Sequence, residues 1–249
     1  MIKKKTKKNS KNYILLVGAS SELADNLIKK LCVKNNLMLL SRKNLAEINS
    51  YKSKNKIYLK YDGSPKAQKK LVSFIKKKSI NITSIIHFSG LHSFSPIKDI
   101  SLKEFKKIYE INCFSFIDIV KLITSDNLSA NLNSIVTISS VASMSGNKGI
   151  SLYSASKSSL NNIVRSFALE LSVKKIRVNS IVLGHINLGM GGKTTKFLTK
   201  KQMKDLENKH PLGFGRTEDL TNSIEFLIDS KKSRWITGVN FILDGGYLA

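Results

Sequence analysis

The sequence predicts one α/β domain built on a doubly wound parallel sheet, and two regularities along the chain indicate it. Short runs that are apolar at almost every position recur at residues 13–17, 37–40, 57–59 and 82–88. Segments with the spacing of helices, such as Pro65–Lys78, lie between these runs. Strands that do not alternate with polar residues are buried on both faces, as parallel strands are when helices connect them.

The length and the charge of the chain bound its organisation. Its 249 residues suffice for one sizeable α/β domain, and neither a repeat nor a Pro/Gly-rich linker divides them. The formal net charge is +25, and residues 1–12 form a basic tail before a domain expected over 13–249. The lysines are scattered through every predicted helix without interleaved aromatic residues. This pattern favours a solvated surface over a nucleic-acid interface, with an acidic carrier protein as the alternative partner.

The cysteines and the histidines indicate neither a redox motif nor a metal site. Cys32 and Cys113 have no metal-binding or redox spacing, which suits a reducing compartment. The histidines lack ligand spacing such as H-x-x-x-H, so we expect no metal. The first apolar run, YILLVGA, is too short for a signal-peptide core or a membrane span. We therefore expect a soluble, cytoplasmic protein that binds no membrane.

The turn after the first apolar run reads VGASSELA and leads into a helix. A dinucleotide pyrophosphate can sit over a helix N-terminus at this place, held by backbone N–H groups and the helix dipole. Gly18, Ser20, Ser21 and Leu23 are the cofactor contacts expected there, whereas Glu22 brings a charge near two phosphates unless it turns outward. An ordinary strand–helix turn is the alternative.

The second apolar run ends in Ser41-Arg42-Lys43. An acidic residue at this place would accept the ribose hydroxyls of NAD(H) and repel a 2′-phosphate. Ser41 carries no charge, and Arg42 can form a charge-assisted pair with the phosphate. The expected cofactor is therefore NADP(H) rather than NAD(H), unless Arg42 only faces solvent.

A candidate acid–base site lies in the stretch VTISSVASMSGNKGISLYSASK, which reads as a strand, a loop and a helix. Tyr153 and Lys157 are four residues apart and therefore share one face of the helix. A fixed positive charge favours the phenolate, so we expect Lys157 to lower the Tyr153 pKa from its ordinary value near ~10. Ser140 follows the strand and could hydrogen-bond a substrate carbonyl oxygen.

With this motif the sequence resembles the short-chain dehydrogenase/reductase family, which carries Ser and then Tyr-x-x-x-Lys at the same spacing. The closing segment WITGVNFILDGGY resembles the end of the family's branch of about 250 residues, and the resemblance extends over residues 12–249. It implies a Rossmann-type fold, a nicotinamide dinucleotide and a catalytic set of four residues: Asn112, Ser140, Tyr153 and Lys157.

The resemblance also assigns roles. Asn112 would bend its helix and hold a water of the proton relay, Lys157 would bind the nicotinamide ribose, and Asp62 would contact the adenine. The alternative for Asp62 is to cap the helix that begins near Ser64. The complete set of expected cofactor-binding residues is Gly18, Ser20, Ser21, Leu23, Ser41, Arg42, Asp62, Gly90, Tyr153, Lys157, Gly184 and Ile186.

The chain departs from the family pattern at several places. Glu22 and Ala24 stand where the phosphate loop usually has glycine, and Leu188 stands where a Thr usually contacts the nicotinamide amide. His87-Phe88-Ser89-Gly90 stands where Asn-Asn-Ala-Gly is usual. Residues 189–210 fall in the family's substrate lid, and we expect a flexible glycine loop followed by a polar helix there.

We therefore expect an NADP(H)-dependent reductase of a carbonyl group, or the reverse dehydrogenase, with a 3-oxoacyl carrier protein as a candidate substrate. A reductase of a sugar or nucleotide-sugar pathway and a non-catalytic dinucleotide-binding protein are the alternatives. The helix over 151–171 has apolar residues on more than one face, from which we expect a homotetramer. These residues are Leu152, Leu160, Ile163, Val164, Phe167 and Leu169.

Overall fold

The computed structural model describes residues 11–43, 55–125, 128, 130–195 and 198–249. Within them a seven-stranded sheet has the order β3-β2-β1-β4-β5-β6-β7, and every neighbouring pair is parallel. The strands are β1 (Lys11–Val17), β2 (Asn36–Ser41), β3 (Lys56–Lys60), β4 (Ile80–His87), β5 (Ser134–Ile138), β6 (Arg177–Leu183) and β7 (Asn240–Leu243). The predicted doubly wound parallel sheet is confirmed.

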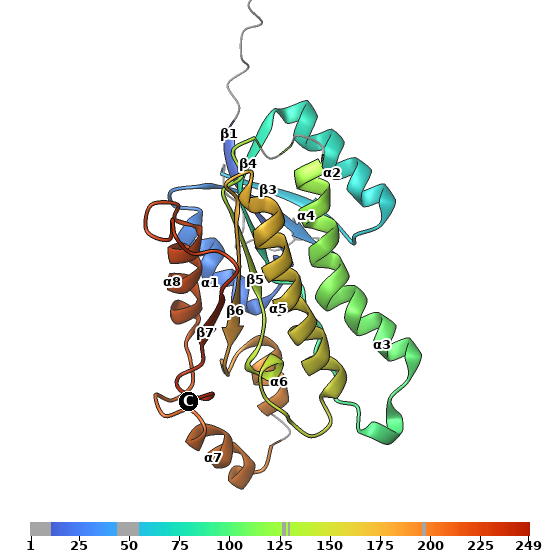
Figure 1. The fold of residues 1–249 in the computed structure, drawn as a ribbon, viewed down its shortest axis with the longest axis vertical. Helices are drawn as coiled ribbons and strands as arrows, with labels where there is room; N and C mark the ends of the chain where they lie inside the picture. The colour runs from blue at the N-terminus through green and yellow to red at the C-terminus, as the bar shows by residue number, and fades with distance from the viewer. Residues whose placement is uncertain (1–10, 44–54, 126–127, 129, 196–197) are drawn as a thin grey trace, which may run out of the picture.

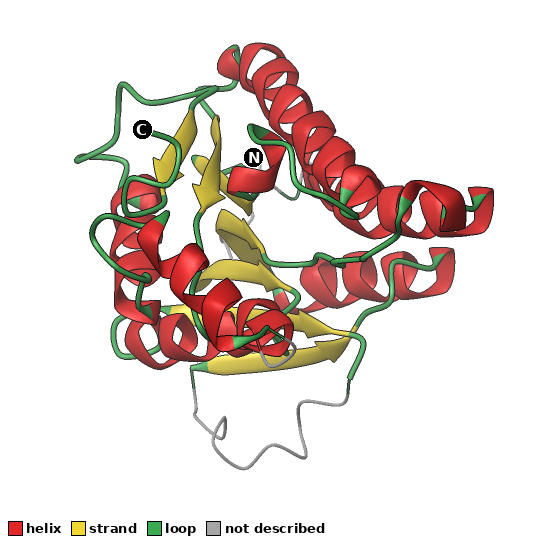
Figure 2. Cartoon of the chain, turned by 90° about the horizontal axis from the view of Figure 1, so that it is seen from below, coloured by secondary structure: helices red, strands yellow, loops and turns green. Residues whose placement is uncertain are grey.

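Helices cover both faces of the sheet (Figures 1 and 2). One face carries α1 (Glu22–Leu31) and α8 (Thr217–Ile228), and the other carries α2 (Pro65–Lys78), α4 (Ser115–Ser125) and α5 (Ser151–Ser172). Successive residues of a strand point to opposite faces. Leu15 and Val17 therefore join one hydrophobic core while Ile14 and Leu16 join the other, which is why the run is apolar throughout.

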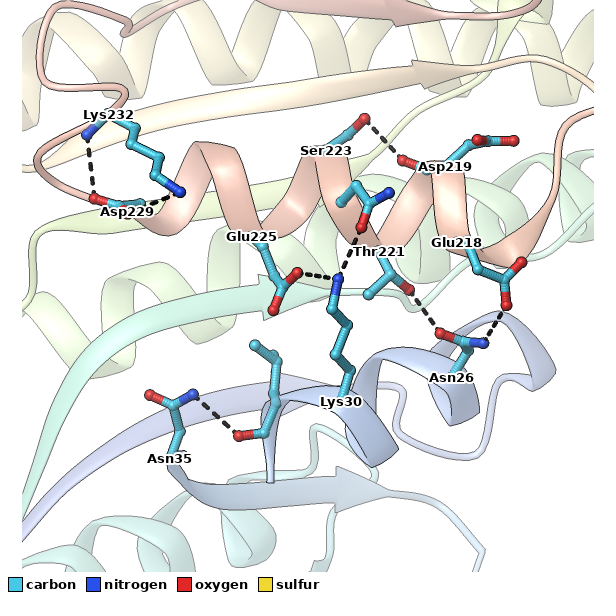
Figure 3. A network of polar contacts seen from close by, with 12 residues as sticks. Asn26, Lys30, Asn35, Glu218, Asp219, Thr221, Ser223, Glu225, Asp229 and Lys232 are labelled. Carbon is cyan, nitrogen blue, oxygen red and sulfur yellow. Dashed lines mark hydrogen bonds and ion pairs between the residues drawn. The ribbon is translucent and has the colours of Figure 1, made fainter. Parts of the chain in front are cut away.

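Polar contacts fasten α1 to α8 along their length (Figure 3). The Lys30 ammonium pairs with Glu225 at 2.5 Å, and the Asn26 amide donates to the Glu218 carboxylate at 2.6 Å. The Thr221 hydroxyl also donates to the Asn26 side chain, at 3.3 Å. These contacts fix α1, whose N-terminus forms the turn after β1.

The start of the domain differs slightly from the expected boundary. Strand β1 begins at Lys11, two residues before the expected Tyr13, because Lys11 and Asn12 continue the pairing with β4. The Asn81 side chain donates to that of Asn12 at 2.7 Å. The remainder of the expected basic tail, residues 1–10, lies outside the described residues.

The segment expected as one helix around Asn112 consists of three parts. Helix α3 (Leu102–Tyr109) leads into a π-helical turn, Glu110–Phe114, and α4 follows without a break. A π-helical turn inserts an extra residue and redirects the helix. The π-helical turn thus lies at the place where the bend at Asn112 was expected.

The segment over 189–210 is more helical than expected. A short helix, α6 (Gly189–Thr195), occupies the place of the expected glycine loop, and α7 (Lys200–Asn208) is the expected polar helix. Thr199 and Gln202 form a capping box that begins α7. The short helices η3 (Ile97–Asp99) and η5 (Val141–Ser143) complete the described elements.

Candidate active site

A cavity of about 220 Å³ lies at the carboxyl ends of the central strands, where open α/β sheets bind ligands. Its lining brings together expected site residues from five separate segments of the chain. These lining residues are Ser21, Leu23, Gly90, Ser140, Tyr153, Lys157, Gly184 and Ile186.

Tyr153 lies in the first turn of α5 and is 7% exposed. Burial raises the pKa of its phenol, and a hydrogen bond with the Ser140 side chain opposes that shift. The expected net lowering of the pKa by Lys157 is therefore wrong in this structure, because desolvation of the phenol dominates. The predicted proximity of Ser140 and Tyr153 is present.

Lys157 lies one helical turn further along α5 and is 3% exposed. Its Nζ donates to the carbonyl oxygen of Ile138 at 2.8 Å and lies 5.9 Å from the centroid of the Tyr153 ring. Burial lowers the pKa of Lys157 to about 8. The ammonium form therefore predominates at neutral pH, beside the phenol, as the helical spacing predicts.

Asn112 connects the π-helical turn to two other parts of the site. Its Oδ1 accepts from the Leu91 amide at 2.6 Å, and its Nδ2 donates to the Leu91 carbonyl at 2.9 Å and to the Ser156 hydroxyl at 2.8 Å. A Cβ on Gly90 would lie 3.4 Å from Lys157 Nζ and 3.7 Å from Asn112 Oδ1. Gly90 therefore lets the loop after β4 approach both residues.

The turn after β1 has the shape that a dinucleotide requires. Gly18 has φ +80°, and a Cβ there would meet the Ser89 amide nitrogen at 2.8 Å, so only glycine fits. The Ser21 side chain makes no capping bond to α1 among the described residues, which leaves the first amides of the helix to a bound anion. Ser20 is exposed in the same turn.

Glu22 turns away from this turn. Its Oε2 accepts a hydrogen bond from the amide of Gly189, 3.0 Å away, at the start of α6. The Glu22 carboxylate, whose charge would oppose a phosphate in this turn, is therefore directed to the start of α6. The residues around the turn fit a pyrophosphate.

Ser41, Arg42 and Asp62 do not line the cavity around Tyr153. Ser41 is 3% exposed and its hydroxyl accepts from the Lys43 amide at 3.1 Å, whereas Arg42 is exposed. Asp62 accepts from the Ser64 amide at 3.0 Å, and it is the Ser64 side chain that caps α2. All three lie at the ends of β2 and β3, on the side of β1 away from β4.

Gly184 and Ile186 follow β6 at the edge of the cavity. A Cβ on Gly184 would lie 2.6 Å from the Asp244 Cα, so the chain after β7 passes too close for any other residue. Ile186 forms an isolated bridge with Gly215. Leu188 also lines the cavity and is 37% exposed, so its side chain replaces the expected Thr with an apolar surface.

Four ring side chains around the same cavity were not among the site residues expected from the sequence. The ring centroids of His92 and Tyr153 are 4.7 Å apart, and His185, His210 and Tyr247 also line the cavity. His210 accepts from the His185 amide at 3.2 Å through Nε2 and donates to the Leu206 carbonyl at 2.8 Å through Nδ1. For His92 alone a signal existed, because it closely follows the end of β4.

The fold and the site define a class of protein. A tight glycine turn after β1, in a parallel α/β sheet, lies at the same cavity as a Ser–Tyr–Lys cluster. Proteins of this class bind a dinucleotide at the carboxyl ends of the strands and position a substrate against it.

Comparisons with known proteins give the family. A family model described as enoyl-(acyl carrier protein) reductase matches residues 39–248. The chain is 28% identical over 245 residues to a 3-oxoacyl-(acyl-carrier-protein) reductase of Buchnera aphidicola, covering 96% of this chain and 98% of the relative. It is 28% identical over 167 residues to carbonyl reductase (NADPH) 2 of Sus scrofa, covering 66% of this chain and 67% of the relative.

Among solved structures, 4-hydroxyisoleucine dehydrogenase complexed with NADH superposes with a TM-score of 0.85 at 26% identity, covering 95% of this chain and 98% of that one. The protein belongs to the short-chain dehydrogenase/reductase family and is an NAD(P)-dependent oxidoreductase. The alternative of a non-catalytic protein does not agree with this membership. In the part of the chain that the structure describes, no helix is both long and apolar enough to cross a membrane.

Proposed function

We propose that the protein is an NADP(H)-dependent carbonyl reductase whose substrate is a 3-oxoacyl chain on a carrier protein. The observation that carries the reaction type is the convergence of Ser140, Tyr153 and Lys157 on one cavity, with Asn112 tied to the loop that borders it. When bound, the nicotinamide supplies a hydride to the carbonyl carbon or takes it in the reverse direction.

In this proposal the chain's own residues handle the oxygen and its proton. Ser140 donates a hydrogen bond to the substrate oxygen, and Tyr153 gives that oxygen its proton as it becomes a hydroxyl. The Lys157 ammonium, held by the Ile138 carbonyl, lies beside the ring of the phenol that gives up this proton. Asn112 holds the loop after β4 in register with α5.

The cofactor would extend from this cavity across β1 to the ends of β2 and β3. Gly18, Ser20, Ser21 and Leu23 would hold the pyrophosphate, and Gly90, Gly184 and Ile186 would border the nicotinamide. Ser41 and Arg42 would receive the 2′-phosphate, with Asp62 near the adenine. The exposed guanidinium of Arg42 and the neutral, buried Ser41 support NADP(H) over NAD(H).

The carrier-bound substrate is supported by similarity to the Buchnera aphidicola reductase and by charge. The net charge of +25 favours association with an acidic carrier protein. The test is NADPH consumption by the purified protein with a 3-oxoacyl thioester and, in parallel, with keto-sugars. Turnover of the thioester alone is the expected result, and turnover of keto-sugars alone would replace this substrate class.

We also propose a homotetramer, but on the basis of apolar side chains that remain exposed in the fold. Most of the apolar residues that suggested it pack on the domain's own core instead, namely Leu160, Ile163, Val164 and Phe167. Leu169 and Val173 remain 77% and 81% exposed at the end of α5, and Phe114 is 55% exposed at the π-helical turn. These exposed apolar side chains support burial of the end of α5 or of the π-helical turn between subunits.

A further inference from the structure

His87 lies at the end of β4, beneath the candidate active site, and is 1% exposed. Its ring nitrogens contact two different elements. Nδ1 lies 3.3 Å from the Thr137 hydroxyl on β5, and Nε2 lies 3.0 Å from the Ser115 hydroxyl, at the first residue of α4. The ring thus joins the central sheet to the helix that follows the π-helical turn.

The surrounding hydrogen bonds assign the ring's tautomer. The Ser115 hydroxyl donates its one proton to the Ile111 carbonyl at 2.7 Å, so its oxygen must accept from His87 Nε2–H. His87 Nδ1 then accepts from Thr137. Burial, together with the nearby positive charge of Lys157, lowers the pKa of His87 to about 3, so the ring is neutral at physiological pH.

The Ser115 hydroxyl donates to the Ile111 carbonyl in place of the Ser115 backbone amide. In an α-helix the Ser115 amide would donate to the Ile111 carbonyl, four residues back. Here that amide reaches the Glu110 carbonyl, five residues back, which is the π-helical pattern. The hydroxyl of the same residue donates to Ile111 instead and thereby stabilises the inserted turn.

The inserted turn decides where Asn112 points. Asn112 is fully buried and lies next to Ile111 in this turn. Its side chain is hydrogen-bonded to Leu91 and Ser156. If the π-helical turn became regular α-helix, Asn112 would rotate about the helix axis by the angle between two successive residues, and these bonds would break.

We propose that His87 is a positioning residue: through Ser115 it holds the π-helical turn that keeps Asn112 bonded to Leu91 and Ser156. Its effect on catalysis rests on the function proposed above, whereas its effect on the position of Asn112 does not. The chain of contacts runs from the sheet through His87 and Ser115 to Ile111, and from the turn to the loop that borders the cavity.

The test uses variants that separate the two ring contacts. Ser115→Ala removes the relay hydroxyl with a minimal change in packing, and His87→Asn is too short to reach Ser115. His87→Gln is the conservative rescue, since its amide nitrogen corresponds to Nε2. Thr137→Val is the matched control, because it removes the bond at Nδ1 and leaves the contact with Ser115.

Two readouts are measured on the full-length protein: hydrogen exchange of the Leu91 amide, which needs no activity, and kcat with an NADPH-dependent carbonyl substrate. We expect Leu91 exchange to accelerate at least ~10-fold and kcat to fall roughly 10- to 100-fold in Ser115→Ala and His87→Asn, because small displacements of catalytic groups have effects of that size. The KM for NADPH should stay within about twofold of the wild-type value. The double variant that combines Ser115→Ala with His87→Asn should show no larger effect than either single variant.

Equal effects in Thr137→Val, or unchanged Leu91 exchange in Ser115→Ala, would overturn the positioning role. Accelerated exchange with unchanged kcat would overturn its catalytic consequence. If the wild-type protein reduces no carbonyl substrate while the exchange pattern appears as expected, the proposed function fails and the positioning role stands.

Discussion

The ammonium group of Lys157 is bonded to the carbonyl oxygen of Ile138, 2.8 Å away, so α5 is fastened to the end of β5 at the floor of the cavity. One hydrogen bond does not offset the unfavourable free energy of burying a full charge. The lowered pKa of Lys157, about 8, reports that imbalance.

The burial of Lys157 predicts a pH dependence of stability. The folded pKa is about 8, against 10.5 for an ordinary lysine, so the unfolded chain holds more protons between these values. The folded state is therefore most stable, as far as Lys157 is concerned, above pH 10.5, where the side chain is neutral in both states. This stability is lost as the pH falls from 10.5 through 8, because the unfolded chain takes up the proton before the buried amine does. The free energy of unfolding of the wild type, minus that of Lys157→Met, should rise with pH in this window by at most about 1.4 kcal/mol per unit. Denaturant melts at several pH values measure it, and a flat difference would contradict the assignment.

Tyr153→Phe keeps the ring and removes the proton that the proposed reaction needs. We expect kcat to fall at least ~10²-fold, which is the lower range for general acid–base catalysis, with an unchanged far-UV spectrum. Tyr61→Phe is the matched control, because the buried Tyr61 hydroxyl has no hydrogen-bond partner among the described residues. The control should keep its activity, and near wild-type turnover in Tyr153→Phe would exclude the mechanism.

Arg42→Ala should reduce the preference for NADPH over NADH. A charged hydrogen bond contributes about 1.5–3 kcal/mol, which at ~1.4 kcal/mol per decade corresponds to a roughly tenfold to hundredfold change in the ratio of kcat/KM values. The control is Arg165→Ala, an exposed arginine on α5 whose guanidinium bonds to Asn162. A ratio unchanged in Arg42→Ala would show that another group reads the phosphate.

The exposed apolar end of α5 predicts where subunits meet. Light scattering at micromolar concentration should give the mass of four chains for the wild type and a smaller mass for Leu169→Asp. Val33→Asp is the control, since Val33 is similarly exposed, at 73%, just after α1. A monomeric wild type would refute the tetramer, and equal dissociation in the control would move the interface away from α5.

Local spacing is what made much of this structure predictable. Apolar runs and helical periods depend on neighbours in sequence, and they predicted the sheet, the helices over 65–78 and 151–171, and the shared face of Tyr153 and Lys157. The bend at Asn112 came from resemblance. The contacts that hold the π-helical turn at this place could not be predicted, because the bond between His87 and Ser115 joins segments that meet only in the fold.

Properties that depend on packing were out of reach of the sequence. The Tyr153 pKa moves upward because the phenol is buried, and burial follows from segments far from it in sequence. Leu160 and Val164 are among the apolar residues from which the homotetramer was expected, but the core of their own domain covers them. His185, His210 and Tyr247 come together because the chain after β7 returns to the lid.

The hydrogen bond between Glu22 and Gly189 has a kinetic consequence. This bond joins residues 167 positions apart in sequence and fastens the start of α6 to the turn that would receive the pyrophosphate. A nucleotide that binds at this turn would add negative charge near Glu22 and so would act on α6, which borders the cavity. We therefore expect an ordered mechanism, with nucleotide entering first and leaving last, and Glu22→Ala should make the order random.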